Sequence, residues 1–306
     1  MKFELPDELM FLKNSKALQH RSSDTMAGKV CVITGATSGV GLEALKQLSK
    51  GGAHMVMVCR NQEKADAVRQ GIINLYGVPV DIIIADFSRL DDVQKAAGMI
   101  LAAYPRIDVL INSAGMHSTK RTLTKDGFET VFCVNHLASF LFTQLLLDRM
   151  KESAPSRIIQ VNSEGHRFNG LDPDDLGWEK RRYTGLKGYG ASKVAQLLTV
   201  WEFADRLNGT GVTINAMHPG DVRTNIGHNN GRLYNFFLHH VTWHFLKDPV
   251  ISGDALYYLA ADQEMRDVSG RFFHLTIEEK PEKHAMDREM GKRIWDISMQ
   301  MTGLLH

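Results

Sequence analysis

Residues 34–41 read TGATSGVG, and they stand between an apolar run, VCVIT (30–34), and a helical stretch, LEALKQLSK (42–50). Gly35 can make a tight turn, Gly39 lets the backbone approach a pyrophosphate, and Gly41 allows a helix to pack against a strand. The N-terminus of that helix would point at the phosphates. A plain turn needs one glycine and not three, so the stretch predicts a dinucleotide site. Its predicted contacts are Gly35, Thr37, Ser38, Gly39, Val40 and Gly41.

Short apolar runs alternate with helical stretches after this loop. They are continuous and do not alternate with polar residues, which is typical of strands covered on both faces in a parallel sheet. Strand and helix in alternation predict an α/β fold, a doubly wound parallel sheet of the Rossmann type, with ligands at the carboxyl ends of the strands. The later runs are HMVMVC (54–59), VDIIIAD (80–86), IDVLIN (107–112), RIIQVNS (157–163), VTINAMH (212–218) and RFFHL (271–275).

The chain is long enough for one large domain. With 306 residues, 43% of them hydrophobic, it can bury a substantial core. We expect helices near 127–150, 189–208 and 250–260, and insertions after strands that form a substrate lid. The predicted divisions are an N-terminal extension (1–27), a Rossmann domain (28–275) with insertions at 164–187 and 221–249, and a helical C-terminal extension (276–306).

The composition indicates which class of partner the protein binds and in which compartment it lies. Lys and Arg number 36 against 35 Asp and Glu, without a basic block, so we expect a small-molecule partner and no nucleic acid. Cys31, Cys59 and Cys133 lie in apolar runs and predict buried thiols in a reducing compartment. The first 25 residues carry charges throughout and do not resemble a secretory signal. The most apolar run, LASFLFTQLLL (137–147), is too short to span a membrane, so we expect a buried helix and a cytoplasmic protein.

The end of the second predicted strand indicates which dinucleotide binds. An NAD site usually places Asp or Glu there, whereas this chain has Cys59 and then Arg60. A guanidinium suits a 2′-phosphate, which a carboxylate would repel. Arg60 could also be a solvated residue at a helix start, but the lack of an acid at 58–61 favours NADP(H).

Five motifs in order resemble the short-chain dehydrogenase/reductase family over roughly residues 28–275. They are TGATSGVG, NSAG (112–115), Ser163 after a strand, YGASK (189–193) and HPGDVRT (218–224). VCR (58–60), VNHLASFLFTQLLL, KGYGASKVAQLL and RIWDISMQMTGL resemble the retinol dehydrogenase-like branch, whose members usually favour NADP(H).

The resemblance implies roles for individual residues. It implies a catalytic tetrad of Asn135, Ser163, Tyr189 and Lys193. It also implies that relatives pair through long helices such as 127–150 and 189–208, so we expect a homo-oligomer. Many animal members begin with a membrane-spanning helix, which we do not expect here. Beyond the glycine loop and Arg60, the implied cofactor contacts are Asp86, Phe87, Asn112, Ala114, Gly115, Tyr189, Lys193, Pro219, Gly220, Val222 and Thr224.

Tyr189 and Lys193 suit the reduction of a carbonyl. Negative charge develops on the oxygen, so a proton donor and a hydrogen bond are needed there. Residues four apart share a helix face, so the ammonium of Lys193 is expected to lower the pKa of Tyr189 toward neutrality. Ser163 would hold the substrate oxygen, and Asn135 would sustain a water path that returns the proton to solvent.

Less specific readings stay open for several of these residues. Asn135 could be an ordinary buried amide, and Ser163 could cap a strand end. His239, His240 and His244 contain an i, i+4 pair that could bind a metal, but no third ligand is evident, so we expect no metal there and favour an amphipathic lid helix. The surrounding aromatic residues predict a hydrophobic pocket wall, and they leave open a peripheral membrane contact. They are Tyr234, Phe236, Phe237, Trp243 and Phe245.

The leading hypothesis is an NADP(H)-dependent oxidoreductase that acts on the carbonyl or alcohol of a hydrophobic small molecule, with Tyr189 as general acid and base. The alternative is a catalytically silent sensor that binds NADP(H) with the same fold. Such a protein typically lacks the tyrosine or the lysine, and this chain has both.

Overall fold

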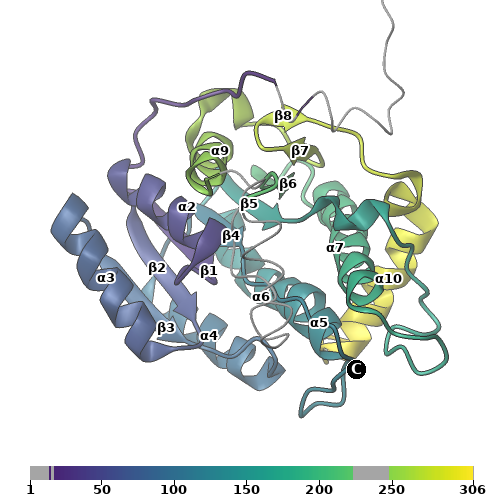
Figure 1. Cartoon of the computed structure of the whole chain (residues 1–306). Helices are drawn as coiled ribbons and strands as arrows, with labels where there is room; N and C mark the ends of the chain where they lie inside the picture. Colours follow the sequence, from purple (N-terminus) through teal and green to yellow (C-terminus); the bar gives the residue numbers. More distant parts are fainter. Residues whose placement is uncertain (1–13, 15–16, 223–247, 306) are drawn as a thin grey trace, which may run out of the picture.

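The expected parallel sheet is present in the computed structural model, which describes residues 14, 17–222 and 248–305 (Figure 1). Eight strands lie in the order β3-β2-β1-β4-β5-β6-β7-β8. All neighbouring pairs are parallel except β7 and β8, which are antiparallel. The strands are β1 (Val30–Thr34), β2 (His54–Cys59), β3 (Val80–Ile84), β4 (Val109–Asn112), β5 (Ser156–Val161), β6 (Val212–His218), β7 (Phe272–His274) and β8 (Ile277–Glu278).

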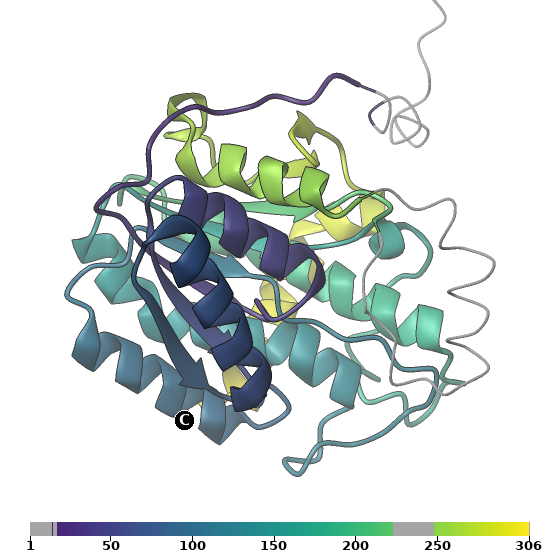
Figure 2. The same cartoon turned by 60° about the vertical axis from the view of Figure 1, so that its left-hand side comes forward.

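Helices cover both faces of the sheet, which explains why the strands are apolar throughout. Within β1, Cys31 and Ile33 belong to one core cluster while Val32 belongs to the other, because successive side chains point to opposite faces. One cluster is completed by α2 (Gly39–Lys50), α3 (Gln62–Tyr76) and α9 (Val250–Ala261). The other is completed by α4 (Leu90–Ala103), α6 (Ala138–Glu152), α7 (Gly185–Arg206) and α10 (Arg288–Met301). The two layers are visible in Figures 1 and 2.

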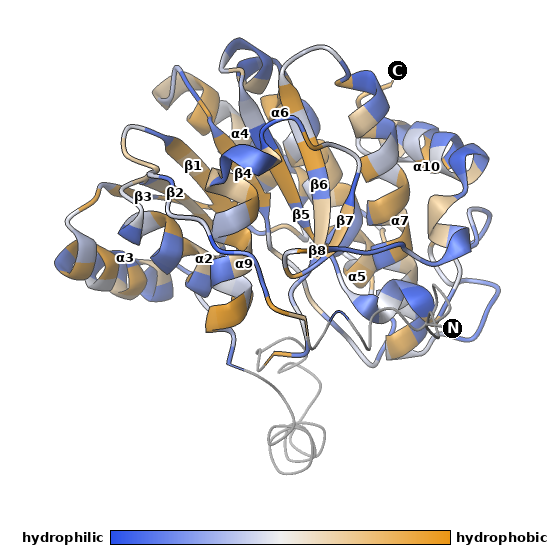
Figure 3. Cartoon of the chain, turned by 90° about the horizontal axis from the view of Figure 1, so that it is seen from above, coloured by the Kyte–Doolittle hydropathy of each residue, from blue (hydrophilic) through white to orange (hydrophobic). Residues whose placement is uncertain are grey.

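The hydropathy of the elements follows this layering. In Figure 3 the central strands are coloured mainly as hydrophobic, while hydrophilic residues gather on the outer helices and loops. The three cysteines, Cys31, Cys59 and Cys133, are buried and free, as the sequence predicted.

The helix expected near 127–150 is interrupted. It consists of α5 (Thr130–Phe132), a π-helical segment (Cys133–Leu137) and α6. Among the described residues, this stretch, Thr130–Glu152, is the one long and apolar enough to cross a membrane by length and composition. Its most apolar window is 72% buried inside the fold, as expected for a helix that packs in a protein core. The predicted burial of the run 137–147 is therefore confirmed, and the π-helical segment, which the sequence did not predict, contains Asn135.

Helix α7 begins four residues earlier than expected. Thr184 caps it, with its hydroxyl accepting a hydrogen bond from the backbone N–H of Lys187 at 3.3 Å. The predicted insertion at 164–187 is therefore shorter and contains a 3₁₀ turn, η3 (Glu164–Arg167). The insertion expected at 221–249 lies almost wholly outside the described residues. The C-terminal extension contains β8 and a second 3₁₀ turn, η8 (Lys283–Met286), before α10.

The strand order reverses between β1 and β4, which are the third and fourth of the eight strands across the sheet. Ligands of doubly wound sheets bind outside the carboxyl ends of the strands at this switch point. The loops that follow these strands therefore define where a functional site should lie.

Candidate active site

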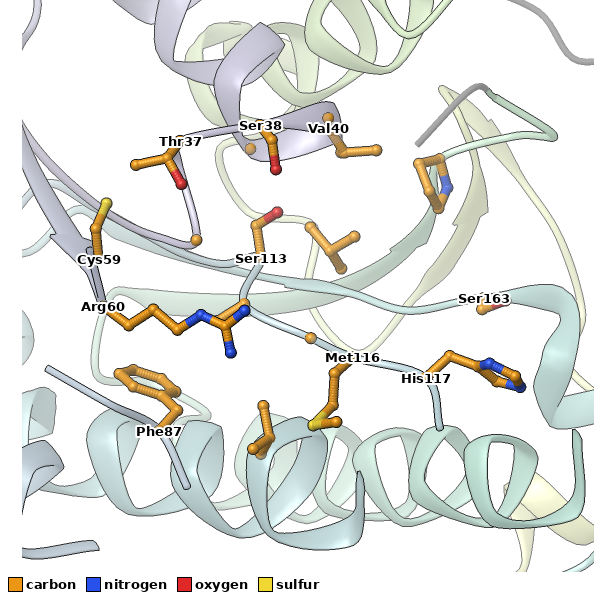
Figure 4. A pocket seen from close by; sticks show the side chains of 18 of the residues that line it. Thr37, Ser38, Val40, Cys59, Arg60, Phe87, Ser113, Met116, His117 and Ser163 are labelled. Atoms are coloured by element: carbon orange, nitrogen blue, oxygen red, sulfur yellow. The ribbon is translucent and has the colours of Figure 1, made fainter. Parts of the chain in front are cut away.

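A cleft of about 890 Å³ opens at the carboxyl edge of the sheet (Figure 4). Residues that follow each of the first six strands line it, together with Tyr189 and Lys193 from α7. The cleft brings together every predicted site residue except Asn112, Asn135 and Thr224. Those lining it are Gly35, Thr37, Ser38, Gly39, Val40, Gly41, Arg60, Asp86, Phe87, Ala114, Gly115, Ser163, Tyr189, Lys193, Pro219, Gly220 and Val222.

The glycine loop needs its glycines for steric reasons. Gly35 has φ +70°, and a Cβ there would lie 2.8 Å from the Cα of Ala114. A Cβ on Gly41 would lie 2.6 Å from the carbonyl oxygen of Gly35. The Thr34 hydroxyl accepts hydrogen bonds from the N–H groups of Ser113 and Ala114, at 3.0 and 2.9 Å, and so joins the loop to the end of β4. The loop therefore keeps a backbone-lined cradle that larger residues would fill.

The N-terminus of α2 supplies unpaired donors to this cradle. Leu42 donates the first bond of the helix to the carbonyl of Ser38, so the N–H groups of Gly39, Val40 and Gly41 have no partner within the helix. Ser38, the N-cap residue, makes no capping hydrogen bond with its side chain. Free N–H groups and the positive end of the helix dipole fit a pyrophosphate. The residues present thus fit the dinucleotide that the sequence predicted.

The outer end of the cleft carries positive charge. Arg60 follows β2, is exposed, and has no carboxylate partner in the part of the chain that the structure describes. Lys64, in the first turn of α3, also lines the cleft. Lys64 was not among the predicted site residues, although its place four residues after Arg60 at a helix start was a usable signal. Figure 4 shows Arg60 beside Phe87, at the opposite end from Ser163.

The inner end of the cleft brings Ser163 and Tyr189 together around Gly165. Ser163 caps η3, its hydroxyl accepting a hydrogen bond from the N–H of Gly165 at 3.1 Å. A Cβ on Gly165 would lie 3.0 Å from Cε1 of Tyr189 and 3.4 Å from the Ser163 hydroxyl. Asn162 holds the Ser163 backbone, accepting its N–H at 2.8 Å. Glycine at 165 therefore lets the phenol and the serine approach each other.

Lys193 lies beneath this pair and is 4% exposed. Its Nζ donates hydrogen bonds to the carbonyl of Val161 at 3.0 Å and to Oε1 of Gln196 at 2.9 Å. The Nζ lies 5.6 Å from the centre of the Tyr189 ring. Burial lowers the pKa of Lys193 to about 7.

The expectation that the pKa of Tyr189 falls toward neutrality is wrong for this structure. Burial raises the pKa of Tyr189, and a hydrogen bond with Ser163 opposes that rise only in part. Two features explain the difference. The Lys193 ammonium is directed to Val161 and Gln196, and its own burial disfavours the charge that would stabilise a phenolate.

Asn135 does not line the cleft but supports its wall. Its side chain accepts from the N–H of Met116 at 2.8 Å, and donates to the carbonyl of Met116 at 3.1 Å and to the Ser192 hydroxyl at 2.9 Å. Its main-chain carbonyl accepts a hydrogen bond from Nε2 of Gln196. Gln196, which the sequence did not single out, thereby connects the Asn135 carbonyl to Nζ of Lys193.

Two other predicted contacts fall elsewhere. The amide of Asn112 is buried and donates to the Thr143 hydroxyl at 2.8 Å, because the last residue of β4 points toward α6 and not into the cleft. Thr224 lies outside the described residues, as do His239, His240, His244 and the aromatic residues around them.

His117 is a further cleft residue that the sequence analysis missed. The His117 and Tyr189 rings meet edge to face, with centroids 5.8 Å apart. A Cβ added at Gly185 would lie 2.8 Å from Nε2 of His117, so the imidazole packs against this glycine. Burial lowers the pKa of His117, so its imidazole is neutral at physiological pH. Its position two residues after NSAG was the available signal. Figure 4 shows it beside Ser163 at the inner end of the cleft.

The family model and the curated relatives that this chain matches point to the same protein family. Residues 29–234 match the family model described as short chain dehydrogenase. The chain is 37% identical over 291 residues to retinol dehydrogenase 13 of Homo sapiens, covering 92% of this chain and 87% of the relative. It is 39% identical over 297 residues to retinol dehydrogenase 14 of Mus musculus, again covering 92% and 87%.

Solved structures share the fold. An uncharacterized protein from Mycobacterium paratuberculosis superposes with a TM-score of 0.74 at 27% identity, covering 92% of this chain and 95% of the other. A short chain dehydrogenase from Shigella flexneri, solved in complex with NADP, gives a TM-score of 0.67 at 23% identity, covering 83% and 99%.

Proposed function

This chain belongs to the short-chain dehydrogenase family, and from that premise we propose that it transfers a hydride between NADP(H) and the carbonyl or alcohol of a hydrophobic small molecule. The observation that carries the proposal is the meeting of Ser163 and Tyr189 around Gly165 at the inner end of the cleft, with Nζ of Lys193 5.6 Å from the centre of the Tyr189 ring. A bound nicotinamide supplies or accepts the hydride. The chain's own residues bind, orient and move a proton.

In the direction of reduction, the Ser163 hydroxyl donates a hydrogen bond to the carbonyl oxygen of the substrate. The raised pKa of Tyr189 keeps its hydroxyl protonated, so it can transfer that proton to the oxygen as negative charge develops there. While it is protonated, Lys193 then stabilises the phenolate that is left, because its Nζ lies 5.6 Å from the centre of the Tyr189 ring. Its burial limits this contribution at pH values above about 7. In oxidation the same steps run in reverse, with the Tyr189 phenolate accepting the proton of the alcohol.

The preference for NADP(H) is supported by the charge at the outer end. Arg60 is exposed and has no carboxylate partner among the described residues, and Lys64 lies on the same rim. Two cations that form no ion pair among the described residues suit a 2′-phosphate. The neutral hydroxyl groups of an unphosphorylated ribose would interact with these cations less strongly.

A hydrophobic substrate is supported by the apolar side chains of the inner cleft and of its neighbourhood. Met116, Val134 and Val161 line the cleft. Phe168, just after η3, and Leu186, in the first turn of α7, are exposed by 74% and 72%. The named relatives are retinol dehydrogenases, which are themselves named for an apolar alcohol.

The proposal extends to a cytoplasmic homo-oligomer that binds no nucleic acid. Its support is indirect: three buried free thiols and a nearly balanced charge. Size-exclusion chromatography with light scattering tests the assembly, and a monomer at micromolar concentration would contradict it. Cell fractionation of the tagged full chain tests the location. A strong association with membranes would favour the peripheral contact that the sequence left open.

The test of the activity follows NADPH oxidation against a panel of aliphatic and aromatic aldehydes and ketones of increasing chain length. We expect turnover that rises with apolar surface and is lost in Tyr189→Phe. Gly170→Ala is a suitable control, because a Cβ at Gly170 meets nothing within 4 Å. If NADPH binds tightly and no compound is turned over, the chain is a cofactor sensor and not an enzyme.

A further inference from the structure

A buried cluster of potential metal ligands lies beside the cleft, at the carboxyl ends of three neighbouring strands. His218 ends β6, His274 ends β7, and Glu164 lies three residues after β5. The parallel register pairs His218 directly with His274, and their rings meet with centroids 4.9 Å apart. One ligand atom from each of the three side chains lies within 4.8 Å of the others.

The hydrogen-bonding of this cluster is incomplete. His218 is 4% exposed, and neither of its ring nitrogens has a hydrogen-bond partner among the described residues. Oε1 of Glu164 is also buried without a hydrogen bond from that part of the chain. Buried polar groups are nearly always paired, so three unpaired atoms at one point call for a specific explanation, such as an ion.

The surrounding residues orient the carboxylates toward the histidines. Arg167 donates to Oε2 of Glu164 and to Oε1 of Glu279, so it occupies one oxygen of each carboxylate. The other oxygens face Nδ1 of His274, at 3.9 Å for Glu164 and 3.7 Å for Glu279. Asn14 donates to Oε2 of Glu279 at 2.8 Å. Such outer partners are typical of metal sites, where they fix the ligating atoms.

The charges of the cluster also favour a cation. The Glu279 carboxylate is buried and the Glu164 side chain is 14% exposed, and both face one guanidinium. This leaves one negative charge when both carboxylates are ionised and the imidazoles are neutral. A buried excess charge is unfavourable unless another ion compensates it. A divalent cation would offset this charge, and Arg167 would remain bound to the outer oxygens of both carboxylates.

We propose that Glu164, His218 and His274 bind Zn²⁺. Zinc takes imidazole nitrogens and carboxylate oxygens at about 2.0–2.2 Å in a tetrahedron, which places ligand atoms about 3.4 Å apart. The 3.9 Å between His274 and Glu164 requires a contraction of about 0.5 Å, and the widest pair of ligand atoms, within 4.8 Å, one of at most about 1.4 Å. Two imidazoles exclude Mg²⁺ and Ca²⁺, which prefer all-oxygen sites. The three ligands leave the fourth position for water.

The site would tie together segments that also form the inner cleft. Glu164 follows Ser163, and His218 both lines the cleft and precedes Pro219 and Gly220. Zinc would therefore fix the ends of β5, β6 and β7 relative to one another. This inference does not depend on the proposed function, because metal binding can be measured without any turnover.

The test strips the full-length protein with a chelator and titrates Zn²⁺ against a chromophoric competitor. We expect one equivalent to bind tightly, and Co²⁺ to give the intense visible bands of a tetrahedral site. Glu164→Gln and His274→Asn should each weaken binding by more than about 100-fold, beyond the 10–100-fold expected for an outer-shell residue. Stoichiometric binding that both variants retain would overturn the proposal, as would no stoichiometric binding by the wild type.

Two controls separate this site from other histidines. His54 forms a hydrogen-bonded pair with Asp81 at the far side of the sheet, 2.7 Å apart, so His54→Asn should leave binding unchanged. The double variant His240→Asn/His244→Asn should also leave it unchanged, and loss of binding there would place the metal on that pair instead. X-ray absorption at the zinc edge of the wild type needs no variant. The X-ray absorption spectrum should show two imidazole ligands on zinc, and a spectrum without imidazole would contradict the assignment.

Discussion

The two ends of the cleft differ in how far water reaches their positively charged side chains. At the outer end Arg60 and Lys64 are exposed, so water solvates their charges until an anion arrives. At the inner end Lys193 is 4% exposed, and burial lowers its pKa to about 7. Under the proposed function this difference separates two tasks: the outer charges would select the cofactor, and the inner charge, which can be lost near neutral pH, would take part in proton transfer.

The largest effect is expected from removing the inner charge. Lys193→Met keeps the length of a buried side chain but leaves no ammonium to stabilise the Tyr189 phenolate. Loss of one such preorganised group typically lowers kcat by about 10²–10³-fold. Steady-state kinetics at saturating NADPH measures this. A variant that retains more than about a tenth of the wild-type kcat would mean that the inner charge is not needed.

Removing the outer charge should affect binding and leave the chemistry intact. Arg60→Ala deletes a charge-assisted hydrogen bond worth about 1.5–3 kcal/mol, so the Kd of NADPH should rise roughly 10–100-fold. The Kd of NADH, measured by the same fluorescence titration, should change by less than about threefold. Equal losses for both cofactors would remove the basis for an NADP(H) preference.

A smaller effect is expected from crowding the reacting groups without changing any charge. In Gly165→Ala the new Cβ would lie 3.0 Å from Cε1 of Tyr189, so the ring must shift. Small displacements of a reacting group slow the reaction, and we expect kcat to fall about tenfold while NADPH binding is kept. Gly170→Ala is the matched control, since its Cβ is unobstructed. Equal activity of the two variants would show that the spacing of Tyr189 and Ser163 is not critical.

The smallest expected effect is a shift in pH dependence. Lys193 loses its proton as pH rises through about 7, so kcat/KM for reduction should fall over that range. In Gln196→Glu a carboxylate would stand 2.9 Å from Nζ, favour the charged lysine, and raise the midpoint by about one pH unit. Gln70→Glu, on the exposed face of α3, should leave the profile unchanged. An unmoved midpoint in Gln196→Glu would show that another group controls it.

The sequence predicted those parts of the site that local patterns determine. The glycine loop was correctly placed because its function requires a strand, a turn and a helix in direct succession. The start of α7 was misplaced, because Gly185 and Gly188 look like helix breakers in sequence. In the structure a Cβ on Gly188 would meet the Tyr183 ring at 2.4 Å, and one on Gly190 would meet the Gly165 carbonyl at 2.7 Å. These glycines serve tertiary contacts that no local pattern records.

The remaining differences also arise from contacts between distant segments. Gln196 meets Lys193 one turn along the helix, but its link to Asn135 depends on how α7 packs against the π-helical segment. The pKa of Tyr189 depends on burial, which the spacing of tyrosine and lysine does not reveal. Glu164, His218 and His274 become neighbours only when β5, β6 and β7 align.

The central claim is that the inner end performs chemistry and the outer end selects the cofactor. The most direct test measures both the Kd of NADPH and the kcat at saturating NADPH for Tyr189→Phe, beside Arg60→Ala. We predict that Tyr189→Phe binds NADPH as the wild type does and loses kcat by about 10²–10⁴-fold. Arg60→Ala should instead bind NADPH roughly 10–100-fold more weakly and keep the kcat of the wild type. Turnover by Tyr189→Phe at a rate close to that of the wild type would contradict the account.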